Sequence, residues 1–308
     1  MQRNDVIEFI LAGLAGCGAG IFTNPLEVIK TRMQLQGELK ARGQHAVFYK
    51  NSLHAAYAIA KSDGILALQS GLVPGLWYQF VMNGFRLGSY QIFVNLGFTD
   101  DKDGNYSFTR RVLAGAIAGV IGTAIGSPLY LVKTHLQSRS AEEIAVGHQH
   151  SHSSMSQGFN KIYKQDGIPG LFRGLNGAIP RGFVGSASQL ASFSTSKDYI
   201  TGLKIFPETS WGNAICASMI GGVVITLFMT PFDVICTRLY NQKVDSNGKG
   251  VLYKSFIDCF IKILKSEGLW GFYKGWGPSF LRLGPHTILS LTFWDRLRVA
   301  YNEFRQGS

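Results

Sequence analysis

Residues 24–36 read "NPLEVIKTRMQLQ" and place one acidic and two basic residues directly after a long apolar segment. Pro25 would usually end a helix. The residues that follow nevertheless keep a helical rhythm, because Glu27, Lys30 and Gln34 are three or four positions apart and share one helix face. The stretch therefore predicts a helix that continues past a proline and carries a charged stripe.

The same pattern returns twice more in the chain. Residues 127–137 read "SPLYLVKTHLQ" and residues 230–240 read "TPFDVICTRLY", so that the three prolines are each 103 residues apart. A second element recurs with nearly the same period, as "DGILALQSG" (63–71), "DGIPGLFRG" (166–174) and "EGLWGFYKG" (267–275). Two unrelated motifs on one period indicate three copies of one unit. We expect repeats at residues 1–100, 101–203 and 204–308.

The composition favours a membrane protein. Of the 308 residues, 46% are hydrophobic and only 16% are charged, against about 25% charged in ordinary soluble domains. Segments such as "AGLAGCGAG" and "AGAIAGVIG" are rich in small residues, which suits close helix packing in lipid. Two apolar segments per repeat are long enough to span a bilayer. We therefore predict an all-α membrane protein with six transmembrane helices, at about 6–36, 72–98, 109–138, 175–203, 211–240 and 276–304.

The net charge of +11 is distributed unevenly. The segments after the first helix of each repeat (37–71, 138–174 and 241–275) hold 14 Lys and Arg, whereas the termini and the links between repeats hold 5. This one-sided bias is typical of membrane proteins, whose basic side faces inward, and it argues against a nucleic-acid groove. Residues 50–61 and 254–265 on the basic side are predicted to be amphipathic helices at the membrane surface.

No pattern for catalysis stands out in the sequence. We find no nucleophile elbow, phosphate loop or metal-binding helix, so we expect neither an enzyme nor a bound cofactor. His148, His150 and His152 alternate in "GHQHSHSS" and could hold a metal. A flexible polar loop is the favoured interpretation, because no acidic or cysteine ligand stands nearby.

The threefold P-x-[DE]-x-x-[KR]-x-[KR] pattern with its following [DE]-G element resembles the mitochondrial carrier family over essentially the whole chain. The resemblance implies six tilted helices in a pseudo-threefold barrel, short matrix helices and a place in the mitochondrial inner membrane. It also implies a central site that opens alternately to either side. A functional monomer and membrane lipids, with cardiolipin as the candidate at the matrix side, are further expectations.

The resemblance assigns the charged stripe to a matrix gate. Ionisable residues in a membrane cost about 2.5–3.5 kcal/mol each on insertion scales, so they should face one another or water. The family pattern pairs Glu27 with Lys133 and Asp233 with Lys30. The third pair is missing, because its two positions hold the neutral residues Tyr130 and Cys236. Two further residues, Gln34 and Gln137, occupy the positions where the family braces such pairs.

The cytoplasmic gate of the family is degenerate here. Its aromatic-[DE]-x-x-[KR] element survives whole only around Asp295, and Lys197 is the one basic partner on another helix. We therefore expect a weak cytoplasmic gate formed by Lys197 and Asp295.

Three arginines mark the candidate substrate site. They are Arg86, Arg181 and Arg282, one on the second predicted transmembrane helix of each repeat. The family geometry places these positions near mid-membrane. Arginine's planar fork suits carboxylates and other oxyanions. No acid lies near them on those helices, so a substrate role is favoured over simple pairing in the barrel. The remaining predicted site residues are Tyr78, Gln79 and Gln189.

"RLGPHT", "QLASFSTSK" and "FRLGSY" resemble the dicarboxylate and oxo-acid branch of the family. That branch implies exchange of small dianions such as dicarboxylates, oxaloacetate and sulfur oxoanions, or of an anion with a proton. Two alternatives stay open. One is a proton or anion leak protein of the uncoupling type, and the other is a receptor with the carrier fold that does not transport.

Overall fold

The computed structural model describes residues 3–40, 48–100, 107–202, 211–245 and 248–306. Long helices dominate these residues, and an isolated β-bridge joins Val244 and Gly250. The long helices are α1 (Arg3–Leu35), α3 (Leu72–Asn95), α4 (Phe108–Ser138), α6 (Leu175–Gly202), α7 (Trp211–Asn241) and α9 (Trp276–Gln306).

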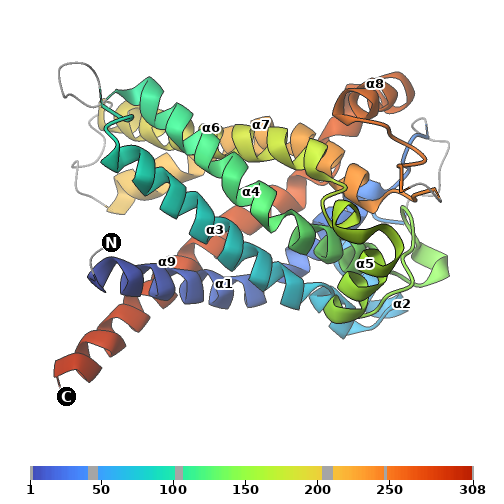
Figure 1. Cartoon of the computed structure of the whole chain (residues 1–308), viewed down its shortest axis with the longest axis horizontal. Coiled ribbons are helices and arrows are strands. Elements are labelled where there is room, and N and C mark those ends of the chain that lie inside the picture. The colour runs from blue at the N-terminus through green and yellow to red at the C-terminus, as the bar shows by residue number, and fades with distance from the viewer. Residues whose placement is uncertain (1–2, 41–47, 101–106, 203–210, 246–247, 307–308) are drawn as a thin grey trace.

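Short helices fill the segments between the two long helices of each repeat. They are α2 (Ser52–Ser62), η1 (Ile65–Gln69), η2 (Glu142–Ile144), α5 (Met155–Leu171), α8 (Phe256–Glu267) and η3 (Leu269–Tyr273). Both predicted amphipathic segments are therefore helical. Helices α2, α5 and α8 gather at one end of the molecule, whereas the chain termini lie at the other end (Figure 1).

The long helices form a closed ring. Each packs against the next one along the chain, and α9 packs against α1 to close the ring. At the end that carries the short helices, α1, α4 and α7 also contact one another. The prolines of these three helices, Pro25, Pro128 and Pro231, lie inside continuous helix. Each helix runs on for about three turns beyond its proline, as predicted, and these last turns are where the three helices meet.

Small residues bring neighbouring helices close together. A Cβ atom on Gly122 of α4 would lie 2.4 Å from the carbonyl oxygen of Met82 on α3. A Cβ atom on Gly119 would lie 2.7 Å from the carbonyl oxygen of Gly182 on α6. Such contacts leave no room for a side chain, which is the packing that small-residue motifs provide where lipid supplies no hydrophobic drive.

Three helical segments of the described chain are long and apolar enough to cross a membrane, judged by length and composition. They are Ile65–Asn95, Phe108–Ser138 and Met219–Asn241. Large apolar side chains such as Phe22, Phe228 and Ile288 are 62–66% exposed on the long helices. An outward apolar surface of this kind fits a lipid environment better than water.

Candidate functional site

A cavity of about 290 Å³ lies inside the ring and is lined by all six long helices. It contains each predicted substrate-site residue: Tyr78, Gln79, Arg86, Arg181, Gln189 and Arg282. Five of the predicted gate residues also line it: Glu27, Lys30, Lys133, Gln137 and Asp233. The ring geometry thus brings together side chains that are far apart in sequence, such as Glu27 and Arg282, which are 255 residues apart.

Two ion pairs join the first helices of the repeats. Lys30 Nζ on α1 lies 2.6 Å from Asp233 Oδ2 on α7. Lys133 on α4 forms an ion pair with Glu27 on α1. Both acid–base contacts expected from the sequence are therefore present in the structure, on the helix ends where α1, α4 and α7 converge.

Each of these acids also binds an arginine from the second long helix of a repeat. Arg181 Nε on α6 lies 2.5 Å from Asp233 Oδ1, and Arg282 Nη1 on α9 lies 2.7 Å from Glu27 Oε1. From the sequence we looked for acidic partners only on the helices that carry the arginines. The partners Glu27 and Asp233 lie on α1 and α7 instead. Each carboxylate is thus shared between one lysine and one arginine.

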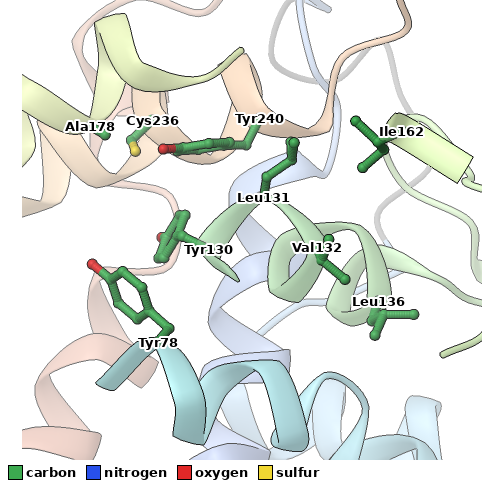
Figure 2. Packing of buried hydrophobic residues seen from close by; sticks show 9 residues of the cluster. All are labelled: Tyr78, Tyr130, Leu131, Val132, Leu136, Ile162, Ala178, Cys236 and Tyr240. Carbon is green, nitrogen blue, oxygen red and sulfur yellow. The ribbon is translucent and has the colours of Figure 1, made fainter. Parts of the chain in front are cut away.

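An aromatic cluster occupies the place of the missing third ion pair. Tyr130 stands 5.0 Å from Tyr78 and 5.1 Å from Tyr240, measured between ring centroids. Figure 2 shows these rings side by side with Cys236, from helices α3, α4 and α7. The Arg181 guanidinium lies 4.8 Å from the Tyr130 ring centroid, within the range of a cation–π interaction. Aromatic packing therefore holds α4 against α7 where charges hold the other two junctions.

Tyr78 ties this cluster to the cavity. Its hydroxyl accepts a hydrogen bond from Arg181 Nη1 at 3.1 Å, although its side chain is buried. Lys133 Nζ lies 5.8 Å from the Tyr78 ring centroid. The first repeat thus has Tyr78 where the other two repeats have an arginine, and this tyrosine orients Arg181 in the cavity.

The two predicted bracing glutamines bind threonines of the neighbouring helix. Gln34 Oε1 accepts from the Thr237 hydroxyl at 2.7 Å, and Gln137 Oε1 accepts from the Thr31 hydroxyl at 2.9 Å. Tyr240 takes the equivalent position in the third junction and bonds Ser127 instead, with 2.7 Å between the oxygens. The glutamines therefore link the same helix pairs as the ion pairs do, one turn further along.

Two buried arginines, which the sequence argument did not single out, fasten the helix ends to the loops. Arg32 Nη1 lies 2.5 Å from Asp63 Oδ2, and its Nε donates to the carbonyl of Gln137 at 3.2 Å. Arg238 binds Glu267 in the same way and donates to the carbonyl of Gln34 at 3.2 Å. Each arginine is the last basic residue of the repeated motif, and each acid opens the [DE]-G element, so the threefold pattern contained this signal.

The charge of Glu267 is stabilised by this arrangement. Burial acts to raise the pKa of Glu267, but the hydrogen bonds and charge of Arg238, followed by those of Lys274, lower it below its usual range. Lys274 Nζ lies 2.6 Å from Glu267 Oε2. A carboxylate held by two cations contributes stability at neutral pH, and this one joins α7 to η3 and α8.

In the middle repeat, His135 stands at the position that Arg32 and Arg238 occupy in the other two. The histidine loop, residues 148–152, packs onto it. His150 stacks on His135 with ring centroids 3.4 Å apart, and the His152 ring lies 5.2 Å from His135. Burial lowers the pKa of His150 to about 3. The predicted flexible loop is therefore wrong for these residues. No group of three or more His, Cys, Asp or Glu side chains among the described residues is arranged to hold a metal.

The outer part of the cavity is more open. Arg86 Nη1 donates to Gln189 Oε1 at 3.2 Å, and Gln189 is exposed. Asp295 is also exposed on α9. The Lys197 side chain lies outside the described residues, so the weak gate between Lys197 and Asp295 stays a prediction.

Comparisons with known proteins follow the same threefold division. The family model described as "Mitochondrial carrier protein" matches residues 2–100, 104–204 and 207–304. Solute carrier family 25 member 35 of Homo sapiens is 52% identical over 295 residues, covering 96% of this chain and 98% of the human protein. The resemblance of "NPLEVIKTRMQLQGEL" and "GPHTILSLTFWD" to members 34 and 35 agrees with this match.

Two fungal relatives have names that state a cargo. The mitochondrial oxaloacetate transport protein of Saccharomyces cerevisiae is 41% identical over 303 residues, covering 96% of this chain and 90% of the yeast protein. The mitochondrial citrate transporter E of Aspergillus niger is 38% identical over 290 residues, covering 94% of this chain and 91% of that protein.

Proposed function

This chain belongs to the mitochondrial carrier family, and we propose that it exchanges small organic or inorganic dianions across the mitochondrial inner membrane. The family is one of transporters rather than enzymes. Relatives named for oxaloacetate and for citrate support an anionic cargo of carboxylate type. Dicarboxylates, oxo-acids such as oxaloacetate, and sulfur oxoanions are the proposed substrates.

The proposed architecture has six transmembrane helices, α1, α3, α4, α6, α7 and α9, in a pseudo-threefold barrel. The closed ring of packing contacts and the threefold family match support it. The three helices α1, α4 and α7 would form the matrix gate, and the short helices α2, α5 and α8 would lie on the matrix side, where the basic segments gather. One copy of the chain suffices, because the ring closes within it.

The strongest support for an anion site is that each of the two carboxylates in the cavity binds two cations. In the ring, Asp233 forms ion pairs with both Lys30 and Arg181, while Glu27 forms ion pairs with both Lys133 and Arg282. The cavity therefore holds four cations against two carboxylates in these contacts. Two positive charges are left for a ligand to neutralise, and Arg86 adds a third uncompensated charge toward the open part of the cavity.

A dianion entering the cavity would compete with the protein's own carboxylates for the two arginines. Each end of the anion would take one guanidinium, since arginine's fork binds carboxylates in a bidentate way. Asp233 and Glu27 would then keep only their lysine partners. Anion binding would thus release α6 from α7 and α9 from α1 at these two contacts, and this gives alternating access a physical cause.

Exchange by purified protein in liposomes tests the function. The liposomes are loaded with one anion, and uptake of the labelled anion is followed for malate, oxaloacetate, oxoglutarate, phosphoenolpyruvate, sulfate, thiosulfate and phosphate. We expect uptake of one or more dianions only when a counter-anion is inside. Uptake into empty liposomes would identify a leak protein. Absence of uptake for every anion, together with no ligand that raises the melting temperature, would identify a receptor that does not transport.

A further inference from the structure

Arg86 differs from the other cations of the cavity in its partner. In the described chain, four more cations line the cavity: Lys30, Lys133, Arg181 and Arg282. Each of these four forms an ion pair with one of the two cavity carboxylates. Arg86 pairs with no carboxylate in the described ranges, and its Nη1 atom donates instead to the neutral Oε1 of Gln189 at 3.2 Å. The charge of Arg86 is therefore available to an anion without the loss of any ion pair.

The contact between Arg86 and Gln189 leaves hydrogen-bond donors free on both side chains. A guanidinium can only donate, so the Gln189 amide turns its oxygen toward Arg86 and its NH₂ group away. Within the part of the chain that the structure describes, that NH₂ group has no partner, and Arg86 makes no second hydrogen bond. Both residues line the cavity, and Gln189 is exposed. Together they can offer several N–H groups and one positive charge to an oxyanion.

This pair lies outside the layer of the two inner arginines, Arg181 and Arg282. The inner layer joins α3 to α6 through the 3.1 Å hydrogen bond between Arg181 and Tyr78. Arg86 lies eight residues after Tyr78 on α3. Gln189 lies eight residues after Arg181 on α6, so the outer contact joins the same two helices about 12 Å further along. The cavity thus has two layers of polar contacts between α3 and α6.

The Arg86 side chain is directed from the outer layer toward the inner one. Side chains on a helix tilt toward its N-terminus. The N-terminus of α3 lies at the end of the molecule that carries the short helices (Figure 1). An anion held by Arg86 is therefore held on the side that faces Arg181.

Close packing of α3 on α4 fixes the position of Arg86. A Cβ atom on Gly122 of α4 would lie 3.1 Å from the Cβ atom of Arg86 and 2.4 Å from the carbonyl oxygen of Met82. The two helices touch here without an intervening side chain, so the backbone of Arg86 cannot move closer to α4. The guanidinium therefore extends from a fixed base into the open part of the cavity, which lowers the cost of ordering it around an anion.

We propose that Arg86 and Gln189 form an outer anion station, which captures the dianion before it reaches the inner arginines. The inference rests on the proposed function and divides binding into two steps. Capture at the outer anion station leaves both cavity carboxylates with all their cations, so the gate contacts stay intact. Transfer to Arg181 and Arg282 must displace those carboxylates, so this second step is the one that moves helices.

The outer anion station accepts small oxyanions as a class. One guanidinium and one amide bind the charged group of an anion, whether carboxylate or sulfate, and make no contact that identifies the rest of the molecule. Discrimination among anions is therefore left to the inner layer.

The separation of KM from the maximal rate tests the proposal. Labelled sulfate, or oxoglutarate if sulfate is not exchanged, is added outside liposomes loaded with the same anion, and initial rates are measured over a range of concentrations. Arg86→Gln should raise KM by about tenfold or more, as expected for a lost hydrogen bond to a charged group. Its maximal rate should stay within about twofold of wild type, because only capture is weakened. Arg181→Gln should lose the maximal rate instead.

Three further variants separate charge from structure. Arg86→Lys keeps the charge and should have a KM much closer to wild type than Arg86→Gln has. Gln189→Ala breaks the same contact between α3 and α6 but keeps the cation, so it should raise KM less than Arg86→Gln does. Lys164→Gln removes an exposed cation of α5 outside the cavity and should leave KM unchanged. Melting temperatures of all the proteins are the folding control.

Salt dependence gives a second measurement, and its main result needs no variant. The charge of Arg86 lies in the open part of the cavity, where dissolved ions screen it. Raising the ionic strength with potassium gluconate should therefore raise the KM of wild type, and should raise that of Arg86→Gln by a smaller factor.

Several results would overturn the outer anion station and leave the exchanger intact. They are an unchanged KM in Arg86→Gln, a maximal rate that falls as in Arg181→Gln, and a wild-type KM that does not depend on salt. Equal KM and equally lowered melting temperatures in Gln189→Ala and Arg86→Gln would also overturn it, since the contact would then only hold α3 to α6. Absence of anion movement by wild type under every condition would instead overturn the proposed function.

Discussion

Arg181 Nε on α6 lies 2.5 Å from Oδ1 of Asp233 on α7. The same carboxylate binds Lys30 on α1 through its other oxygen at 2.6 Å. A residue proposed to bind substrate and a residue proposed to close the matrix side therefore share one acid. The arrangement with Glu27, Lys133 and Arg282 repeats this relationship on the neighbouring helices. Ligand binding and gate closure thus draw on the same two carboxylates.

The first prediction concerns the pair of Lys30 and Asp233. Asp233→Lys should reduce exchange by about tenfold or more, because removing the acid leaves buried cations without a partner. Adding Lys30→Asp should restore exchange only in part, since Arg181 would still face a lysine at position 233. Initial exchange rates of the two single variants and the double variant form the test. Full restoration would mean that Arg181 does not depend on Asp233, and equal loss in all three would contradict the pairing.

The second prediction concerns Tyr78. Tyr78→Phe removes the hydroxyl that accepts from Arg181 but keeps the ring packed against Tyr130. It should change the ratio of exchange rates among the anions of the panel, because Arg181 is then less firmly oriented. Tyr78→Ala also opens the aromatic cluster and should lower the melting temperature in addition. Identical anion selectivity in wild type and Tyr78→Phe would exclude this role.

Close helix packing gives the third prediction. Gly119→Leu should cost about 1–3 kcal/mol of stability or more, as overpacking does, because even a Cβ atom there would meet the Gly182 carbonyl at 2.7 Å. Gly88→Ala on α3 is the control, as an added Cβ atom there meets nothing within 4 Å. The melting temperature of purified Gly119→Leu should fall below that of wild type, and that of Gly88→Ala should be unchanged. A normal melting temperature for Gly119→Leu would show that α4 and α6 are further apart than described.

The fourth prediction is a pH dependence from His150. Burial lowers its pKa from the ordinary 6.5 to about 3 in the folded protein. Between these two pH values the unfolded chain binds a proton that the folded chain does not, so stability falls as pH falls through that window. The slope for one such group is at most about 1.4 kcal/mol per pH unit.

The readout is the melting temperature at several pH values from about 7 down to about 5. His150→Gln should lose less stability over this range than wild type, while His54→Gln on α2 should follow wild type. Parallel curves for wild type and His150→Gln would contradict the packing of His150 against His135.

The repeated motif made the helical fold predictable from sequence, and the resemblance to the carrier family implied the two interhelical ion pairs. A period of 103 residues places Lys30, Lys133 and Cys236 at equivalent points of three helices, so that a closed ring brings their neighbours into reach. The arginine contacts were harder to predict. Arg181 meets Asp233 across two helices that follow each other in the chain, and nothing in the local sequence of α6 indicates which acid lies opposite.

The histidine loop was misjudged for a related reason. Residues 148–152 are polar and lie next to flexible residue types, and local composition alone favours a mobile loop. What orders them is His135, a change from arginine that is visible only when the three repeats are aligned. Arg32 and Arg238 bind acids at this position in the other repeats, whereas the His135 ring stacks on His150.

Exchange by arginine variants tests the central claim most directly. Arg181→Gln and Arg282→Gln each remove a cavity cation, while Arg282→Lys keeps the charge and loses the bidentate fork. Initial rates of anion exchange are measured for the purified proteins in liposomes, with the melting temperature as a folding control. We predict that the two glutamine variants lose exchange, and that Arg282→Lys is impaired by about tenfold or more. Normal exchange by Arg181→Gln and Arg282→Gln proteins that melt like wild type would contradict an anion carrier with an arginine-lined site.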